Sequence, residues 1–276
     1  MSENTGDLKL VGNSSKLKRR VSMHIYILPN MLTTANLFFG FYSIIHSIKG
    51  DFVYASYAVV AAAVFDLFDG RLARMTRSTS RFGAEYDSLS DLISFGMAPG
   101  ILLYLWALQP FGRVGWVASF LYVACGALRL ARFNVQVGVI EKQYFQGLPI
   151  PMAAGIVASC VLAFRELGLE AYNSVYILAM TFLLSMVMVS TFRYRSFKDM
   201  DLKHRMPFSY LVLGILLFVV VAYNPEVMLF ALFLIYAVLG AVFGLFRLGR
   251  KPAKLKSAPE YLEQSQGDLL EEEDDE

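Results

Sequence analysis

The chain has 276 residues, of which 56% are hydrophobic and 17% charged, and its formal net charge is +2. Together with a mean hydropathy of +0.49, this composition excludes an ordinary soluble domain and predicts a polytopic membrane protein of the all-α class. The charge gives no reason to expect nucleic-acid binding, because the basic residues are spread through short loops. Cys125 and Cys160 lie in apolar runs without CxxC spacing, so we expect buried small side chains rather than a disulfide or metal pair.

The chain begins with a polar, basic segment. Residues 1–22 are expected to form a flexible arm that rests on anionic lipid headgroups. Residues 23–248 are predicted to form the transmembrane domain, and Pro29-Asn30 introduces its first span. Residues 249–276 are expected to be a disordered cytoplasmic tail that is acidic at its end.

Apolar runs predict about eight membrane spans. The third passes through Asp87 and Asp91 and continues to about Leu108. The other predicted spans cover about 31–48, 52–69, 114–131, 150–164, 174–192, 208–223 and 227–246.

Loop charges predict the orientation of these spans. With an even number of spans, both termini share one side, and all of the 25 lysines and arginines except Lys49, Arg113 and Arg165 fall on that side. Positive charge concentrates in cytoplasmic loops. Both termini, and the acidic stretch described next, are therefore expected at the cytoplasmic face.

Four aspartates stand in or beside apolar runs, where an unpaired charge is very costly. On a helix, Asp66 and Asp69 share one face, and Asp87 and Asp91 lie one turn apart on the following span. Something cationic must compensate them. Carboxylate oxygens suit a hard divalent cation such as Mg²⁺ or Mn²⁺, which usually shares its ligand shell with substrate phosphates. The alternative is an intramembrane proton or ion pathway.

The residues between the aspartates favour a phosphate ligand. Gly70 lets a pyrophosphate approach the backbone, Ala73 lets a neighbouring helix come close, and Arg74 can reach a phosphate oxygen. Two cations would polarise a phosphoanhydride while a carboxylate accepts a proton from an attacking hydroxyl. This arrangement predicts phosphoryl-type transfer.

The spacing D-x2-D-G-x2-A-R-x8-G-x3-D-x3-D, from Asp66 to Asp91, resembles the motif of the CDP-alcohol phosphotransferase family. The resemblance implies that Asp66, Asp69, Asp87 and Asp91 hold two divalent cations and that Asp91 is also the general base. It further implies a homodimer. The CDP contacts that it implies are Gly70, Arg74 and Ser80, with Pro29, Asn30, Met31 and Leu32 before the first span.

Several further segments are similar to bacterial CDP-diacylglycerol–serine O-phosphatidyltransferases. They cover residues 28–33, 91–99, 127–134, 145–151 and 193–198. The implied reaction joins CDP-diacylglycerol and L-serine to give phosphatidylserine and CMP, a step of phospholipid biosynthesis, in the bacterial inner membrane. Serine carries a carboxylate, so the site should contain a cation. The candidates are basic residues at the ends of the fourth and sixth spans: Arg129, Arg132, Arg193, Arg195 and Lys198.

Other functions stay open at this point. The acceptor alcohol of the same family could instead be glycerol 3-phosphate, inositol phosphate or choline. A cation transporter would place its carboxylates near mid-membrane, whereas these lie at a helix end. An aromatic prenyltransferase would show Asn-Asp-x-x-Asp boxes, and none occurs. Direct attack by serine is expected rather than a phosphatidyl-enzyme, because Asp91 is better placed as a base than any Ser, Cys or His as a nucleophile.

Overall fold

The computed structural model describes residues 6–76, 80–136, 144–190, 193–195 and 208–248. The chain divides into two units, Met1–Gly244 and Leu245–Glu276. The candidate site belongs entirely to the first unit. The tail predicted at 249–276 and the candidate serine contact Lys198 lie outside the described residues.

Apart from two short strands and the connecting turns, the described chain is helical, which confirms the all-α class. Two π-helical segments, Leu92–Met97 and Tyr104–Leu108, and a 3₁₀ turn, Gln109–Phe111, continue the third predicted span beyond α3 and around α4. The helices are α1 (Gly6–Lys49), α2 (Phe52–Thr76), α3 (Arg81–Asp91), α4 (Ala98–Leu103), α5 (Arg113–Gln136), α6 (Ile150–Glu166), α7 (Val175–Val189), α8 (Phe208–Tyr223) and α9 (Pro225–Leu248).

Each predicted span coincides with helix, but not every helix is long enough to cross a membrane by itself. Within the described ranges, five helical stretches reach the necessary length and hydropathy. They are Leu28–Lys49, Phe52–Leu72, Arg81–Phe111, Arg113–Val135 and Pro225–Val242. A helix rises about 1.5 Å per residue, so α7 with its 15 residues is shorter than the ~30 Å hydrocarbon layer. The count of about eight spans therefore stays a prediction.

The N-terminal helix differs from the sequence expectation in its continuity. α1 begins at Gly6 and runs through Pro29, so its backbone is helical across most of the expected arm. A proline removes only one backbone donor, and in hydrocarbon a continuous helix is the way to satisfy the remaining backbone groups. The single hydroxyl proton of Thr33 is shared between the carbonyl oxygen of Pro29, at 3.1 Å, and a carboxylate oxygen of Asp69, at 3.0 Å. The first predicted span, 31–48, is therefore the later part of a longer helix.

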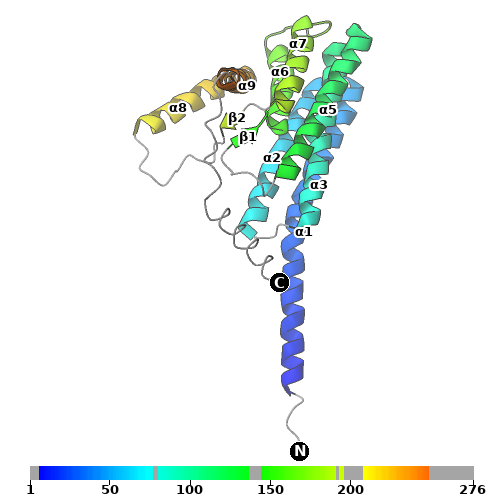
Figure 1. Cartoon of the computed structure of the whole chain (residues 1–276), viewed down its shortest axis with the longest axis vertical. Helices are drawn as coiled ribbons and strands as arrows, with labels where there is room; N and C mark the ends of the chain where they lie inside the picture. The colour runs from blue at the N-terminus through cyan, green and yellow to red at the C-terminus, as the bar shows by residue number, and fades with distance from the viewer. Residues whose placement is uncertain (1–5, 77–79, 137–143, 191–192, 196–207, 249–276) are drawn as a thin grey trace, which may run out of the picture. The chain divides into compact units, whose positions relative to one another are not determined.

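The helices of the first unit pack around a core of apolar side chains. α1 packs most extensively on α2, α5 packs on α7, and α2 packs on α6 (Figure 1). α1 also contacts α3 and the first π-helical segment. At Gly40 a β-carbon would stand only 2.7 Å from Cα of Ser94, so the absence of a side chain permits this close helix contact. α1 is thereby fixed against the helix that carries Asp87 and Asp91.

A two-stranded ribbon joins the entry of α6 to the exit of α7. β1 (Tyr144–Gln146) pairs antiparallel with β2 (Arg193–Arg195), and Phe145 lies opposite Tyr194. The following residue, Gly147, has φ of +77° and lies against the backbone carbonyl of Met188. A side chain there would be both strained and obstructed. Residues 144–147 are therefore held against residues 188–190 and 193–195.

Candidate metal centre

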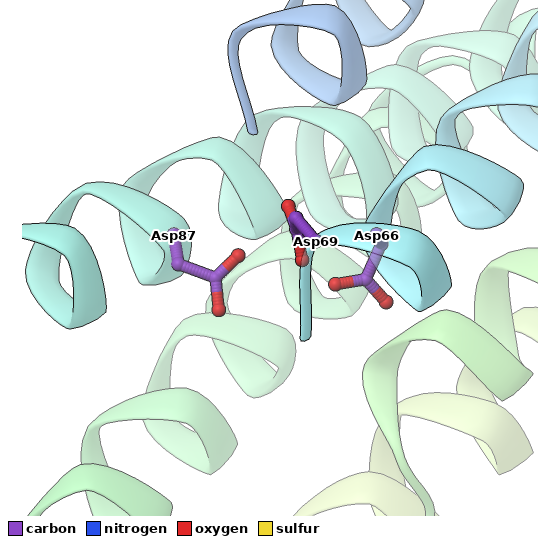
Figure 2. Close-up of side chains that lie close together, drawn as sticks. All are labelled: Asp66, Asp69 and Asp87. Atoms are coloured by element: carbon purple, nitrogen blue, oxygen red, sulfur yellow. The ribbon is translucent and has the colours of Figure 1, made fainter. Parts of the chain in front are cut away.

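Three aspartates from two helices converge at one place. Asp66 and Asp69 lie near the end of α2, and Asp87 lies in α3. One carboxylate oxygen from each lies within 4.8 Å of the others. Figure 2 shows Asp66 and Asp87 extending toward one another from opposite sides, with Asp69 between them. The structure therefore brings together three of the four predicted ligands.

Local sequence explains how the helices present these groups. A three-residue spacing puts Asp66 and Asp69 on one face of α2. α3 begins after Ser80, whose hydroxyl caps the helix by accepting a hydrogen bond from the backbone N–H of Gly83 at 2.9 Å. The cap fixes the start of α3 and thereby the angular position of Asp87. Ser80 thus has a structural role in addition to its predicted contact with CDP.

Asp69 is the most buried of the three, with only 4% of its surface exposed. Its Oδ2 accepts a hydrogen bond from the Thr33 hydroxyl at 3.0 Å, and its carboxylate also accepts one from the backbone N–H of Gly70. Asp87 differs, because its buried Oδ1 has no hydrogen-bond partner among the described residues. A buried carboxylate oxygen without a donor is costly. A ligand at this point would remove that cost.

The cluster fits a divalent cation. Among the described residues, the ion pair that the structure contains joins His46 to Asp51, and both residues lie outside the cluster. No basic side chain therefore neutralises Asp66, Asp69 or Asp87 in the described part of the protein. Carboxylate oxygens at this spacing form the donor set that Mg²⁺ and Mn²⁺ prefer. The unsatisfied oxygen of Asp87 supports the same assignment.

Asp91 lies beside the cluster and is held differently. It is the last residue of α3, and its Oδ1 accepts a hydrogen bond from Nδ2 of Asn36 at 3.1 Å. The charges of Asp66 and Asp87 act on it. Asp91 is not one of the three residues whose ligand atoms lie within 4.8 Å of one another. Its predicted role as a fourth ligand stays a prediction.

Two candidate serine contacts on α5 have different surroundings. Arg129 is 8% exposed, interacts electrostatically with Asp91, and has a buried Nε with no partner in the described residues. Its guanidinium carbon lies 5.6 Å from the centre of the Phe133 ring. Arg132 instead donates from Nη1 to the carbonyl oxygen of Val189 at 2.9 Å. It thereby joins α5 to the last residue of α7.

The predicted CDP contacts before the first span lie in α1. Asn30 is close to the start of α3, because a β-carbon at Gly83 would be 3.4 Å from its Oδ1. Pro29 is buried, Leu32 is half-buried and Met31 is exposed. Gly70 follows Asp69 directly in α2.

The remaining predicted contacts cannot be placed as side chains. The side chains of Arg74, Arg193 and Arg195 lie outside the described part of the structure, although the backbone of each is in α2 or β2. Their roles stay predictions.

Sequence reasoning missed two polar residues that support the aspartates. Thr33 donates to Asp69 and Asn36 donates to Asp91, both from α1. A signal was present. Small or polar residues recur at three- and four-residue intervals in an otherwise apolar helix, a pattern typical of one buried face. This buried face comprises Thr33, Asn36, Gly40, Ser43 and Ser47.

Comparison with known proteins places this arrangement in a family. The chain is 39% identical over 221 residues to CDP-diacylglycerol–serine O-phosphatidyltransferase of Helicobacter pylori, covering 79% of this chain and 92% of the relative. It is 34% identical over 170 residues to the Mycobacterium leprae protein of that name, covering 60% and 56% respectively. It is 43% identical over 137 residues to archaetidylserine synthase of Methanothermobacter thermautotrophicus, covering 49% and 58%.

The matched family region contains the aspartate cluster and, in α5, the candidate serine contacts Arg129 and Arg132. Residues 26–191 match the CDP-alcohol phosphatidyltransferase family. This is the family that the motif from Asp66 to Asp91 predicts, and the match confirms a transferase of phospholipid metabolism. The chain therefore belongs to the CDP-alcohol phosphatidyltransferase family.

Proposed function

We propose that the protein transfers the phosphatidyl group of CDP-diacylglycerol to the hydroxyl of L-serine, giving phosphatidylserine and CMP. The observation that carries this proposal is the convergence of Asp66, Asp69 and Asp87 within 4.8 Å, on a chain 39% identical to a relative with that name. Several segments are similar to bacterial CDP-diacylglycerol–serine O-phosphatidyltransferases and support serine over other acceptor alcohols. These segments are residues 28–33, 91–99, 127–134, 145–151 and 193–198. A buried cation, Arg129, beside Asp91 provides a partner for the carboxylate of serine.

The aspartate cluster would hold two Mg²⁺ or Mn²⁺ ions, which supply charge neutralisation for the diphosphate of the donor. Thr33 and the backbone of Gly70 hold the carboxylate of Asp69 in place by hydrogen bonds. Arg74 and Asn30 are proposed to contact the CDP moiety from α2 and α1. Because the donor is a lipid, its acyl chains can stay in the bilayer while its headgroup enters the site.

Asp91 is proposed to accept the proton of the serine hydroxyl. As that proton moves to the carboxylate, the serine oxygen bonds to the phosphorus that bears diacylglycerol. The phosphoanhydride bond breaks and CMP leaves with the bonding electron pair. Direct displacement needs no protein nucleophile, consistent with Cys125 and Cys160 being buried thiols. The proposed general base is therefore Asp91, next to the proposed metal ligands.

The setting follows from the distribution of charge. We place the site and both termini at the cytoplasmic face of the bacterial inner membrane, with about eight spans, because basic residues concentrate in the loops on that side. The arm at 1–22 is proposed to contact anionic lipids and the tail at 249–276 to stay disordered. The family resemblance supports a homodimer.

A direct assay tests the acceptor. Purified protein in lipid nanodiscs is supplied with CDP-diacylglycerol, labelled L-serine and either Mg²⁺ or Mn²⁺. We expect labelled phosphatidylserine and an equal amount of CMP, and neither product after a chelator is added. Glycerol 3-phosphate, inositol phosphate and choline serve as competing acceptors. A labelled product only with one of these would contradict the serine assignment.

Arg129→Gln is expected to raise KM for serine because it removes the buried cation beside Asp91. A charge-assisted hydrogen bond contributes about 1.5–3 kcal/mol, which corresponds to roughly a 10- to 100-fold change. The KM for CDP-diacylglycerol should stay unchanged. Steady-state kinetics with each substrate varied in turn makes this measurement.

Arg132→Gln is the matched control, since Arg132 lies three residues further along α5 and bonds to Val189. It is expected to lower thermal stability while KM for serine stays near the wild-type value. If both substitutions raise KM for serine equally, Arg129 has no special part in acceptor binding. If neither does, the serine carboxylate binds elsewhere.

A further inference from the structure

We propose that Asn36 is a positioning residue for Asp91, fixing Oδ1 of that carboxylate so that its other oxygen, Oδ2, faces the acceptor hydroxyl. The inference rests on the proposed role of Asp91 as general base. It adds a residue from α1, outside the motif of α2 and α3, to the machinery of the reaction.

The side chain of Asn36 is buried and is hydrogen-bonded to Asp91. Asn36 is fully buried, with 0% of its surface exposed, and its Nδ2 lies 3.1 Å from Oδ1 of Asp91. An ionised carboxylate only accepts hydrogen bonds, so the amide nitrogen must face it. The Oδ1 atom of Asn36 has no partner among the described residues. The bond to Asp91 is therefore what orients this amide.

The backbone of Asn36 is hydrogen-bonded to the helix turn that follows Asp91. Its carbonyl oxygen accepts a hydrogen bond from the Ser94 hydroxyl at 3.0 Å, and one turn further along α1 Gly40 packs directly on Ser94. Ser94 lies in the π-helical segment that begins immediately after Asp91. Such segments often occur at functional sites. α1 thus holds Asp91 by its side chain and the following turn by its backbone.

Thr33 gives the contrast that makes the role of Asn36 specific. It lies one turn earlier on the same face of α1, is 4% exposed, and donates to Asp69, a member of the metal cluster, at 3.0 Å. One helix therefore supplies one donor to a proposed metal ligand and another to the proposed base. Loss of the Thr33 donor should affect metal binding, whereas loss of the Asn36 donor should affect the rate of turnover.

The test compares Asn36→Leu and Asn36→Ala with Thr33→Val in nanodiscs. Loss of a residue that orients a functional group typically costs about 10- to 100-fold in activity or metal affinity. We expect both Asn36 variants to lower kcat by that range while KM for CDP-diacylglycerol and Mn²⁺ affinity by electron paramagnetic resonance stay unchanged. Tm should fall in both variants, because Oδ1 of Asp91 loses its buried donor. Thr33→Val should instead weaken Mn²⁺ binding. The alanine variant provides the result if leucine at this buried position prevents folding.

Ser47→Ala serves as the control on α1, because Ser47 is buried and its hydroxyl donates only within the helix, to the Ser43 carbonyl. It is expected to behave as wild type. The proposal is overturned if kcat is unchanged in the Asn36 variants, or if their Mn²⁺ affinity falls together with kcat. CMP release is followed with serine and with the competing acceptors. A wild-type protein active only on another alcohol contradicts the proposed acceptor, whereas a low kcat of Asn36→Leu on that alcohol still supports positioning.

Discussion

Asp91→Asn is expected to lower kcat for phosphatidylserine formation by roughly 10²- to 10⁴-fold, the range that a general base contributes. The substituted amide cannot accept the proton of the serine hydroxyl, although its oxygen can still accept the bond from Asn36. The protein should keep its fold, because the side-chain volume barely changes. The measurement is the rate of CMP release at saturating serine and CDP-diacylglycerol, with Tm recorded on the same preparation.

The matched control is Asp51→Asn. Asp51 has a half-exposed side chain and pairs with His46 at 3.3 Å, outside the aspartate cluster. Its substitution should leave turnover at the wild-type rate. If Asp91→Asn keeps a rate close to wild type, Asp91 is not the base. Trapping of a lipid-labelled protein would contradict direct displacement and require a nucleophile in its place.

Asp87→Asn is expected to abolish measurable turnover and to weaken Mn²⁺ binding by on the order of 10²-fold or more, because loss of even an outer-shell partner costs about 10- to 100-fold. The reason is specific to this carboxylate. Its buried Oδ1 has no hydrogen-bond partner in the described residues. This oxygen is therefore available to a cation, and no hydrogen bond of the protein satisfies it when the cation is absent. Calorimetric or paramagnetic titration of Mn²⁺ into the nanodisc protein measures the change independently of activity.

A structural control distinguishes metal binding from folding. Removing a charge from a crowded acidic cluster reduces repulsion among Asp66, Asp69 and Asp87. The Asp87→Asn protein is therefore expected to keep or raise its Tm in the absence of metal and to lose the stabilisation that metal gives the wild type. Unchanged Mn²⁺ affinity would show that the cluster does not hold the cation.

The sequence alone predicted the helical class, the helical character of the apolar runs and the clustering of Asp66, Asp69 and Asp87. The reason is that hydrophobic length and the spacing of Asp66, Asp69 and Asp87 are local properties, read along a helix without reference to its neighbours. It did not predict that the first span continues a helix that begins at Gly6 and includes Pro29. Local proline chemistry disfavours a helix interior, whereas the demand for hydrogen-bonded backbone in hydrocarbon favours a continuous helix.

The sequence alone could not predict which residues of distant helices contact one another. Arg129 and Arg132 are equivalent as sequence signals, since both are basic residues near the end of one span. The structure separates them: Arg129 is buried and interacts electrostatically with Asp91, whereas Arg132 bonds to the end of α7. The reason is that three residues along a helix rotate a side chain by about 300° in total, so each arginine meets a different neighbour.

The sequence by itself thus determined which residues carry charge into apolar helices and at what spacing, because a charge in hydrocarbon is costly wherever the chain folds. Only the tertiary structure decided how α1 takes part, placing Thr33 against Asp69 and Asn36 against Asp91 across more than thirty intervening residues. Those pairings depend on how closely helices approach, and Gly40 against Ser94 sets that approach between α1 and the helix that carries Asp91. Packing of this kind is a property of two surfaces together, which no single stretch of sequence contains.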